Sequence, residues 1–523
     1  MAQFEIKNGV AIIPEGTTKF GSGAFKGCTS LTSITIPASV TEIGMAAFQD
    51  CTSLKSVTIS ESVTNIGHEA FKGCRLLDNI VVAEGNPKYD SREGCNAIIE
   101  TATNTLIAGC KSTVIPESVT VIGRAAFSNY TRLKSIIIPE GVTEIKKNAF
   151  EGCILLESIT IPESVTEIGN WAFYGCASLK SIIIPESVTK IGDYAFYNCT
   201  SLKSITIPES VTRIAENAFY GCSELESVVI PNSVTEIGKN TFRACFSLKS
   251  ITIPESVTKI GALAFNVCTS LESIVIPESV TKIDDGAFSS CKSLKSITIP
   301  ESVKAIGEGA FAGCTSLKSI TIPGSVGTIR YQTFARCTSL EDVVMSKGVK
   351  KIGYEAFEGC TSLKSISVPV SVKEIDDNAF VNCTSLESIV LPKVKKIGHS
   401  AFNGCTSLES IRMLESTTEI SASAFRGCVS LKNITIPNSV TEIVSEAFKG
   451  CTSLKSITIP NSVTKIGSSA FDGCTLLENI TIPEGVTEIG EDAFKGCTSL
   501  ESITIPNSVT EIGNWAFYGC TSL

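Results

Sequence analysis

One phrase of 23 residues decides the fold of this chain, and a clear copy of it is "CTSLKSITIPESVTRIAENAFYG" at residues 199–221. The phrase returns with small changes along most of the 523 residues, and 21 Ala-Phe or Thr-Phe pairs mark its copies. The cysteine that opens it recurs at the same spacing, at Cys28 to Cys74, Cys153 to Cys383 and, after a deletion near Lys393, Cys405 to Cys520. A period of this length indicates a solenoid, in which each copy forms one coil that stacks on the next.

The first half of the phrase predicts a short strand followed by a sharp turn. Ile205 and Ile207 alternate with Thr206, so the two isoleucines should point into the core and the threonine outward. Pro208 has no N–H to donate and should end the strand. Val211 should then bring the chain back to the core.

The second half of the phrase predicts a helical turn. Ile191, Ala195, Phe196 and Cys199 have the spacing of one helix face, so residues 192–199 should form a short helical turn against the core. Each coil then offers about eight inward side chains, which only stacked coils can bury. The expected fold is an α/β repeat solenoid, an arc of about 21 coils with a parallel β-sheet and short helical turns.

The whole pattern, L-x-x-I-x-I-P-x-x-V-x-x-I-x-x-x-A-F-x-x-C, resembles the leucine-rich repeats of the BspA-like family. That resemblance implies a bacterial cell-surface or secreted protein that binds proteins or glycans, often as an adhesin. The start of the chain, "MAQFEIKNGVAIIP" (1–14), lacks the basic residues and apolar stretch of a signal peptide. In this the chain departs from the family pattern, so the sequence also leaves a cytoplasmic location open.

Departures from the period divide the chain into four segments. We expect an N-terminal cap hairpin with the first coil at 1–27, repeats at 28–74, an irregular insert with a hairpin at 75–115, and repeats with an uncapped C-terminal end at 116–523. The cap hairpin is predicted from Asn8-Gly9, which stands between two apolar runs in residues 4–14.

The insert holds the first group of candidate binding residues. Its stretch "CNAIIETATNTLIAGC" (95–110) predicts a hairpin, and Cys95 and Cys110 either form a disulfide across its base or fill core positions separately. The polar loop before it is either a plain connection or a binding loop on a rigid scaffold. Its candidate binding residues are Tyr89, Asp90, Arg92 and Glu93.

Two later departures from the repeat supply further candidates. Arg330 and Tyr331 stand in "TIRYQTFARC" (328–337), and Arg412 replaces the usual threonine in "IRMLESTTEI" (411–420). Repeat decay explains both stretches, and a binding patch is the alternative.

The composition argues against several classes of protein. The net charge of −9 is spread along the chain with no basic stripe, which makes nucleic acid an unfavourable partner. No apolar run reaches the roughly 18 residues of a membrane helix. The chain has two histidines and neither metal-ligand spacing nor a phosphate loop, so we expect no enzyme activity and no cofactor. Of the 22 cysteines, those at the repeat position should form a buried ladder of free thiols.

The remaining surfaces suggest two modes of association. The outward strand positions carry mostly Ser and Thr beside alternating Lys and Glu, which favours weak, extended or multivalent binding or contact with a flat, repetitive surface. The C-terminal end suggests a different mode. The last coil should expose Leu500, and this coil should then pair with another copy of the chain or fray. The self-association candidates are Val509, Ile512, Phe517 and Leu523. The alternative to a binding protein is therefore a self-assembling scaffold.

Overall fold

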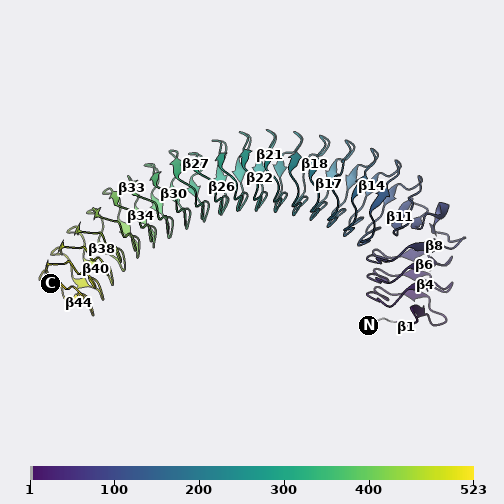
Figure 1. Cartoon of the computed structure of the whole chain (residues 1–523), viewed down its shortest axis with the longest axis horizontal. Helices are drawn as coiled ribbons and strands as arrows, with labels where there is room; N and C mark the ends of the chain where they lie inside the picture. The colour runs from purple at the N-terminus through teal and green to yellow at the C-terminus, as the bar shows by residue number, and fades with distance from the viewer. Residues whose placement is uncertain (1–3) are drawn as a thin grey trace. The chain divides into compact units, whose positions relative to one another are not determined.

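The computed structural model describes residues 4–523, so the first three residues of the predicted cap segment, 1–27, lie outside the described residues. The chain forms two compact units, Met1–Ser256 and Val257–Leu523. Within each unit, consecutive coils lie side by side, as Figure 1 shows. Each regular coil contains a first strand, a second strand and a turn segment that carries the Ala-Phe pair.

The first unit contains two rows of coil strands and two hairpins. Its first strands are β4 (Ser33–Thr35), β6 (Ser56–Ile59), β8 (Asn79–Val82), β13 (Ser135–Ile137), β15 (Ser158–Thr160), β18 (Ser204–Thr206), β19 (Ser227–Val229) and β21 (Ser250–Thr252). Its second strands are β3 (Lys19–Phe20), β5 (Glu42–Ile43), β7 (Asn65–Ile66), β12 (Val121–Ile122), β14 (Glu144–Ile145), β16 (Glu167–Ile168), β17 (Lys190–Ile191) and β20 (Glu236–Ile237). The hairpin strands are β1 (Glu5–Lys7), β2 (Val10–Ile12), β9 (Tyr89–Asp90), β10 (Ile98–Glu100) and β11 (Thr105–Ala108).

The second unit repeats the two rows without an insert. Its first strands are β23 (Ser273–Val275), β25 (Ser296–Thr298), β27 (Ser319–Ile322), β29 (Asp342–Met345), β31 (Ser365–Ser367), β33 (Ser388–Leu391), β35 (Ser410–Met413), β37 (Asn433–Ile434), β39 (Ser456–Thr458), β41 (Asn479–Thr481) and β43 (Ser502–Thr504). Its second strands are β22 (Lys259–Ile260), β24 (Lys282–Ile283), β26 (Ala305–Ile306), β28 (Thr328–Ile329), β30 (Lys351–Ile352), β32 (Glu374–Ile375), β34 (Lys396–Ile397), β36 (Glu419–Ile420), β38 (Glu442–Ile443), β40 (Lys465–Ile466), β42 (Glu488–Ile489) and β44 (Glu511–Ile512).

The predicted parallel stacking of the coils is confirmed by the strand register. Ser204 of β18 lies opposite Ser227 of β19, the same position one coil later, and the pairing is parallel. Ile205 and Ile207 are buried while Thr206 is exposed, as the alternation predicted. The sheet therefore has one face in the core and one in solvent.

The predicted helical turn at residues 192–199 is wrong. Tyr194 and Asn198 have φ values of 58° and 56°, which an α-helix does not allow. The N–H groups there alternate between a local bond, such as Tyr197 N to Tyr194 O, and a bond to the next coil, such as Phe196 N to Ala218 O. Because every second N–H bonds to the neighbouring coil, the segment is a pair of stacked turns. Among residues 4–523, the only helical element is the 3₁₀ turn η1 (Arg92–Gly94).

The core consists of ladders of identical side chains. Phe196 stacks on Phe173 at a centroid distance of 5.3 Å and on Phe219 at 5.5 Å. The predicted cysteine ladder is confirmed, because the cysteines at the repeat position are free thiols and all but Cys520 are buried. Most of these thiols also donate a hydrogen bond, as in the 3.2 Å bond from Cys199 Sγ to the carbonyl of Phe173.

The insert interrupts this order, but later than residue 75. Strand β8 still pairs with β6 in the regular register, Ser56 opposite Asn79, so the irregular stretch begins after Val82. The sequence hides this coil because Ala83 stands where the usual proline marks the end of the strand. The predicted hairpin forms from β10 and β11, with β9 added antiparallel to β10.

The disulfide that the sequence allowed between Cys95 and Cys110 is absent from the structure, and both side chains are buried free thiols. Their sulfur atoms have different partners. Cys110 Sγ donates to the carbonyl of Asn96 at 3.3 Å, and Cys95 Sγ lies 3.8 Å from the carbonyl of Ala97. The two cysteines therefore fill separate core positions, which was the alternative interpretation.

The expected cap hairpin is confirmed at the N-terminal end. Strands β1 and β2 pair antiparallel around Asn8 and Gly9, whose φ values of 50° and 81° suit a tight hairpin turn. Leu500 of the last coil is fully buried, contrary to the expected exposure.

Candidate functional site

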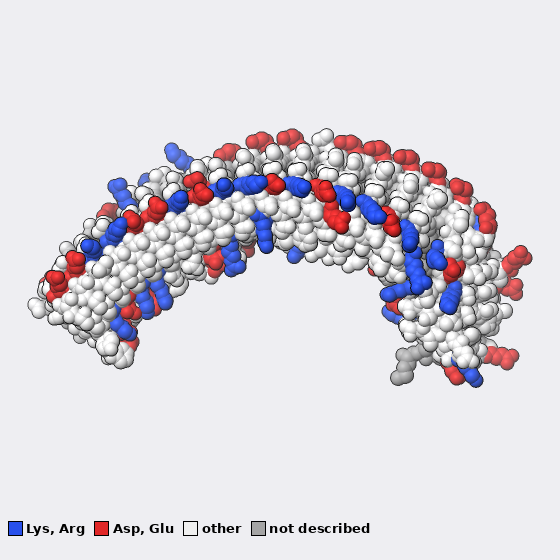
Figure 2. Space-filling view, in the orientation of Figure 1, with Lys and Arg blue, Asp and Glu red and all other residues white. Residues whose placement is uncertain are grey.

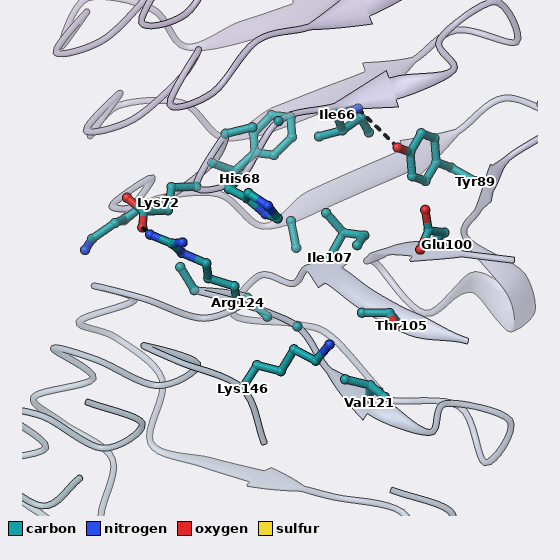
Figure 3. Close-up of a pocket in the computed structure, with 18 of the residues that line it drawn as sticks. Ile66, His68, Lys72, Tyr89, Glu100, Thr105, Ile107, Val121, Arg124 and Lys146 are labelled. Atoms are coloured by element: carbon teal, nitrogen blue, oxygen red, sulfur yellow. Dashed lines mark hydrogen bonds and ion pairs between the residues drawn. The ribbon is translucent and has the colours of Figure 1, made fainter. Parts of the chain in front are cut away.

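The insert opens a pocket of about 570 Å³ between the coil that contains β7 and the coil that contains β12. In Figure 3, Ile66 and His68 line it from the β7 side, Tyr89 and Glu100 from the insert, and Arg124 and Lys146 from the following coils. Its volume falls in the range of small-molecule sites. We call this the insert pocket.

The pocket forms because the insert replaces the regular second strand and turn segment of one coil. The turn segments on either side then meet only at their outer ends. There, Gly73 N donates to Ser128 O at 3.0 Å, and Lys72 Nζ lies 2.7 Å from Glu151 Oε2. Inside these contacts, the coil-to-coil hydrogen bonds of the regular repeat are missing.

Basic side chains outnumber acidic ones in the lining of the insert pocket. Arg124 donates to Glu69 Oε1 from Nε at 3.1 Å and from Nη2 at 2.8 Å. Burial acts to raise the pKa of Glu69, but the bond from Arg124 and the charge of Lys72 lower it on balance, so this carboxylate stays ionised. Lys146 has only a distant partner, with 3.8 Å between its Nζ and Glu144 Oε2.

The four candidate residues of the insert loop have mostly structural contacts. Tyr89 is buried, and its hydroxyl accepts a 3.1 Å hydrogen bond from Ile66 N at the wall of the pocket (Figure 3). Asp90 and Arg92 pair with each other at 2.7 Å, and Arg92 also donates to Asn104. Glu93 alone is exposed, within η1. The loop is therefore a braced connection that supplies one wall of the pocket.

The later candidates lie on different faces of their coils. Arg330 and Tyr331 are exposed on a turn segment, where the Tyr331 ring lies 5.5 Å from that of Tyr354. Arg412 is exposed on β35, opposite Val390 of β33. The structure thus gives Arg412 no contact with the tyrosine pair.

A second candidate site lies on four consecutive turn segments of the first unit, and sequence reasoning missed it. We call it the aromatic surface, and its half-buried residues are Trp171, Tyr174, Tyr194, Tyr197, Tyr220 and Arg243. The missed signal was the exact period of Tyr174, Tyr197 and Tyr220, which places three rings at one position of neighbouring coils.

The rings of the aromatic surface stack on one another in two rows. Tyr197 lies 4.9 Å from Tyr174 and 4.5 Å from Tyr220, with nearly parallel planes. In the second row, Trp171 stacks on Tyr194 at 5.3 Å. Burial and the neighbouring Tyr220 raise the pKa of Tyr197, so its hydroxyl remains a neutral donor and acceptor.

A cation covers one end of each row. Arg243 lies 5.5 Å from the centre of the Tyr220 ring, and Lys147 lies 4.4 Å from that of Trp171. These contacts hold the rings at fixed positions, and they leave ring edges and hydroxyl groups at the surface.

The strand faces have the paired charges that the sequence predicted. Lys180 Nζ lies 2.9 Å from Glu157 in the first unit, and Lys295 Nζ lies 2.7 Å from Glu272 in the second. Figure 2 shows basic and acidic side chains interleaved along the coils. Exposed pairs of this kind contribute only about 0–1 kcal/mol each, so they serve solubility more than stability.

The self-association candidates lie together in the last coil. Ile512 and Leu523 are 48% and 52% exposed, while Val509 and Phe517 are half-buried. Phe517 still stacks on Phe494 at 5.4 Å, so the ladder continues into this coil.

Residues 4–523 contain neither a cluster of metal ligands nor a membrane-spanning helix. No group of three or more His, Cys, Asp and Glu side chains in that range could hold a metal ion. Across the same residues, no helix has the length and apolar character needed to cross a membrane.

Comparison with known proteins agrees with the architecture. A leucine-rich repeat protein from Bacteroides ovatus is 28% identical, with a TM-score of 0.52 and coverage of 83% of this chain and 92% of its own. A leucine-rich cell surface protein from Faecalibacterium prausnitzii is 27% identical, with a TM-score of 0.34 and coverage of 78% and 92%. A leucine-rich repeat protein of T. pallidum is 36% identical over 31% of this chain and 78% of its own, with a TM-score of 0.30. No curated protein matches the chain.

The family is decided by the repeat itself. The model of the BspA type leucine-rich repeat region matches residues 6–105, 106–226, 213–341, 327–455 and 395–523, which together span nearly the whole chain. These ranges include the insert as well as the regular coils. The chain belongs to the BspA-type leucine-rich repeat family.

Proposed function

We propose that this chain is a non-catalytic binding protein that binds a protein partner through the aromatic surface. The observation that carries the proposal is the stacked row Tyr174–Tyr197–Tyr220, which ends at Arg243. Tyr, Trp and Arg are the residue types that dominate binding energy at protein interfaces. The paired charges of the strand face contribute little by comparison.

The geometry of the rings favours a protein over a glycan as the partner. A sugar stacks its C–H groups on the open face of an aromatic ring, and the faces of Tyr197 are covered by Tyr174 and Tyr220. Trp171 has Lys147 on one side and Tyr194 close by. The accessible ring edges and hydroxyls suit hydrogen bonds to a polypeptide and packing against its apolar side chains.

Stacking also prepares the rings for binding. A tyrosine held between two neighbours loses little rotational freedom when a partner arrives, and that reduces the entropic cost of association. Because the rows extend over four coils, the contact is extended along the solenoid, in keeping with a scaffold that presents one long surface.

The test is a binding assay with immobilised extracellular matrix proteins, for which an adhesive surface protein is expected to have affinity. Tyr197→Ala should weaken the interaction about 30-fold or more, as loss of a hot-spot residue does. Thr206→Ala, on the strand face of the same coil, should leave it unchanged. Tyr331→Ala tests the rival turn-segment candidate. If Tyr331→Ala abolishes binding while Tyr197→Ala does not, the proposal is wrong.

A surface or secreted location is the second part of the proposal. Its support is the family, whose members are typically found there. Fractionation of the source cells with an antibody to the chain would test it. Recovery of the chain entirely in the cytosolic fraction would contradict the location and, with it, an adhesive role.

Self-association is the second candidate function, and the exposure of Ile512 and Leu523 favours it. A second copy that covers these side chains would remove apolar surface from water. Light scattering over a range of concentrations would show a rising mass, and Ile512→Asp would abolish the rise. A mass that stays constant at high concentration would exclude this candidate.

A further inference from the structure

The insert pocket contains backbone N–H groups that have lost their usual acceptors. In the preceding regular coil, Ala46 N donates to His68 O at 3.0 Å and Phe48 N donates to Ala70 O at 2.8 Å. The groups at the same positions one coil later are the N–H groups of Glu69 and Phe71. Neither has a hydrogen-bond acceptor within residues 4–523.

Phe71 N lacks its acceptor because a residue of the insert bonds to that carbonyl. Ala126 O is the carbonyl that Phe71 N would reach in a regular stack, and it accepts instead from Gly109 N at 2.9 Å. Glu69 and Phe71 both line the insert pocket, so their N–H groups point from the end of a regular stack into the region that the pocket occupies. Unpaired N–H groups that converge on a hollow form a site for a negatively charged atom.

The side chains of the pocket add positive charge at the same place. Four basic residues line it, Lys72, Lys88, Arg124 and Lys146, against the two acidic residues Glu69 and Glu100. The chain as a whole has a net charge of −9, so this excess is local. Figure 3 shows Arg124 and Lys146 on the side of the pocket opposite His68 and Ile66.

Not all of these charges are neutralised by fixed partners. Lys72 is taken by Glu151 at 2.7 Å, and Lys88 lies 3.4 Å from Glu100. Arg124 uses its Nε and Nη2 atoms on a single oxygen of Glu69, which leaves further N–H groups free for a ligand. Within residues 4–523, the shortest ion-pair distance of Lys146 is the 3.8 Å to Glu144.

We propose that the insert pocket binds a small organic anion, of up to about the size of a sugar acid, by its carboxylate or phosphate group. Arg124, Lys146 and the N–H groups of Glu69 and Phe71 would hold the anionic group, and Ile66 and Ile107 would contact the apolar part of the ligand. This site is separate from the aromatic surface, so the two proposals stand or fall independently.

The experiment is isothermal titration of the full chain with glucuronate, inorganic phosphate and glucose. Saturable binding of one glucuronate or one phosphate per chain, without binding of glucose, is the expected result, and the two anions separate a carboxylate site from a phosphate site. Arg124→Ala should reduce the affinity about 10- to 100-fold, as loss of a charge-assisted bond does.

Two further variants distinguish binding from a structural effect. Glu69→Gln removes the carboxylate that competes with the ligand for Arg124, so this variant should bind the anion more tightly. If the substitution acted only by disturbing the fold, the variant would bind the anion more weakly. Arg213→Ala, an exposed arginine in the same unit, should change nothing. Equal binding of glucose and glucuronate, an equal loss with Arg213→Ala, or no saturable binding of either anion would overturn the proposal.

Hydrogen exchange gives an independent readout. Without a ligand, the amides of Glu69 and Phe71 should exchange faster than those of Ala46 and Phe48, which have acceptors. A bound anion should slow exchange at 69–71 and leave 46–48 unchanged. Equal protection of the two segments in the free protein would contradict the inference.

Discussion

At the scale of single residues, the cysteine ladder shows how repetition changes the meaning of a residue type. Twenty-two cysteines in a chain would ordinarily suggest disulfides or metal sites. Here most thiols of the ladder are buried and donate to a phenylalanine carbonyl, as Cys176 does to Phe150 at 3.2 Å. Burial raises the pKa of these thiols, so they behave as small apolar side chains and not as nucleophiles.

The burial of the thiols predicts the outcome of a thiol titration. In the native protein, a thiol reagent should react slowly and with few groups, because the thiolate form is suppressed and access is blocked. After denaturation without a reductant, all 22 cysteines should titrate, including Cys95 and Cys110. Oxidation of half or more of them in freshly purified protein would show that the ladder is not a set of free thiols.

The same burial makes the fold sensitive to alkaline pH. Burial raises the pKa of Cys222 from an ordinary value of 9.0 to about 12. Between these values the unfolded thiol loses its proton and the folded thiol keeps it. The free energy of unfolding should therefore fall as the pH rises through that window, by up to about 1.4 kcal/mol per pH unit for each such thiol.

Denaturant unfolding at several pH values from 8 to 11 would measure this slope. Cys222→Ala should make the slope shallower, since it removes one group whose pKa differs between the two states. Ser201→Ala, on the preceding coil, serves as the control. An unchanged slope in Cys222→Ala would mean that the thiols do not account for the alkaline sensitivity.

At the scale of the element, a coil is held by its neighbours more than by itself. Its second strand is two residues long, as in Lys190–Ile191, and exists because Ile168 and Ile191 pair across coils. Its turn segment contains a positive φ at Tyr194, which costs energy that the bonds to the next coil offset. An isolated coil would have neither.

The Ile-Gly step after the second strand is a close approach of two coils. A Cβ atom on Gly192 would lie 2.5 Å from Asn170 N and 2.6 Å from the carbonyl carbon of Gly169, both backbone atoms that cannot move aside. Gly192→Ala should therefore lower the free energy of unfolding by about 1–3 kcal/mol. At Gly327 an added Cβ meets nothing within 4 Å, so Gly327→Ala should change it by less than about 0.5 kcal/mol. Equal effects in thermal unfolding would contradict this packing.

The sequence predicts some of these elements and not others, for physical reasons. Ile205 and Ile207 alternate with Thr206 around a strand, and their burial was predicted correctly. The turn segment was mistaken for a helix because Ala195 and Phe196 have helical spacing, whereas the backbone angles of Tyr194 and Asn198 leave no signal in a hydrophobic pattern.

The two candidate sites also differ in whether the sequence could have predicted them. The aromatic surface was predictable, because Tyr174 and Tyr197 stand one period apart. The insert pocket was not, because it depends on which acceptor Ala126 O finds once a hairpin displaces part of a coil. Composition and spacing do not encode that competition, although they did place Tyr89 in the loop that forms one wall.

At the scale of the molecule, each unit is a one-dimensional stack in which a coil contacts the coils before and after it. Stability is then a sum over coils and the interfaces between them. A surface such as the aromatic rows exists only where consecutive coils carry the same kind of side chain at the same position. The insert interrupts the regular stack of coils in the first unit, and the insert pocket lies at that interruption.

Hydrogen exchange along the second unit of a Phe288→Ala variant tests this stack most directly. Phe288 is fully buried and lies 5.4 Å from both Phe265 and Phe311, so its loss should cost about 3–5 kcal/mol. Protection should fall in the coils of those three phenylalanines and stay unchanged around Phe448 and Phe471, while Ser289→Ala, in the same turn, should alter nothing. A uniform loss of protection along the whole unit would contradict the stack of coils that contact only their neighbours.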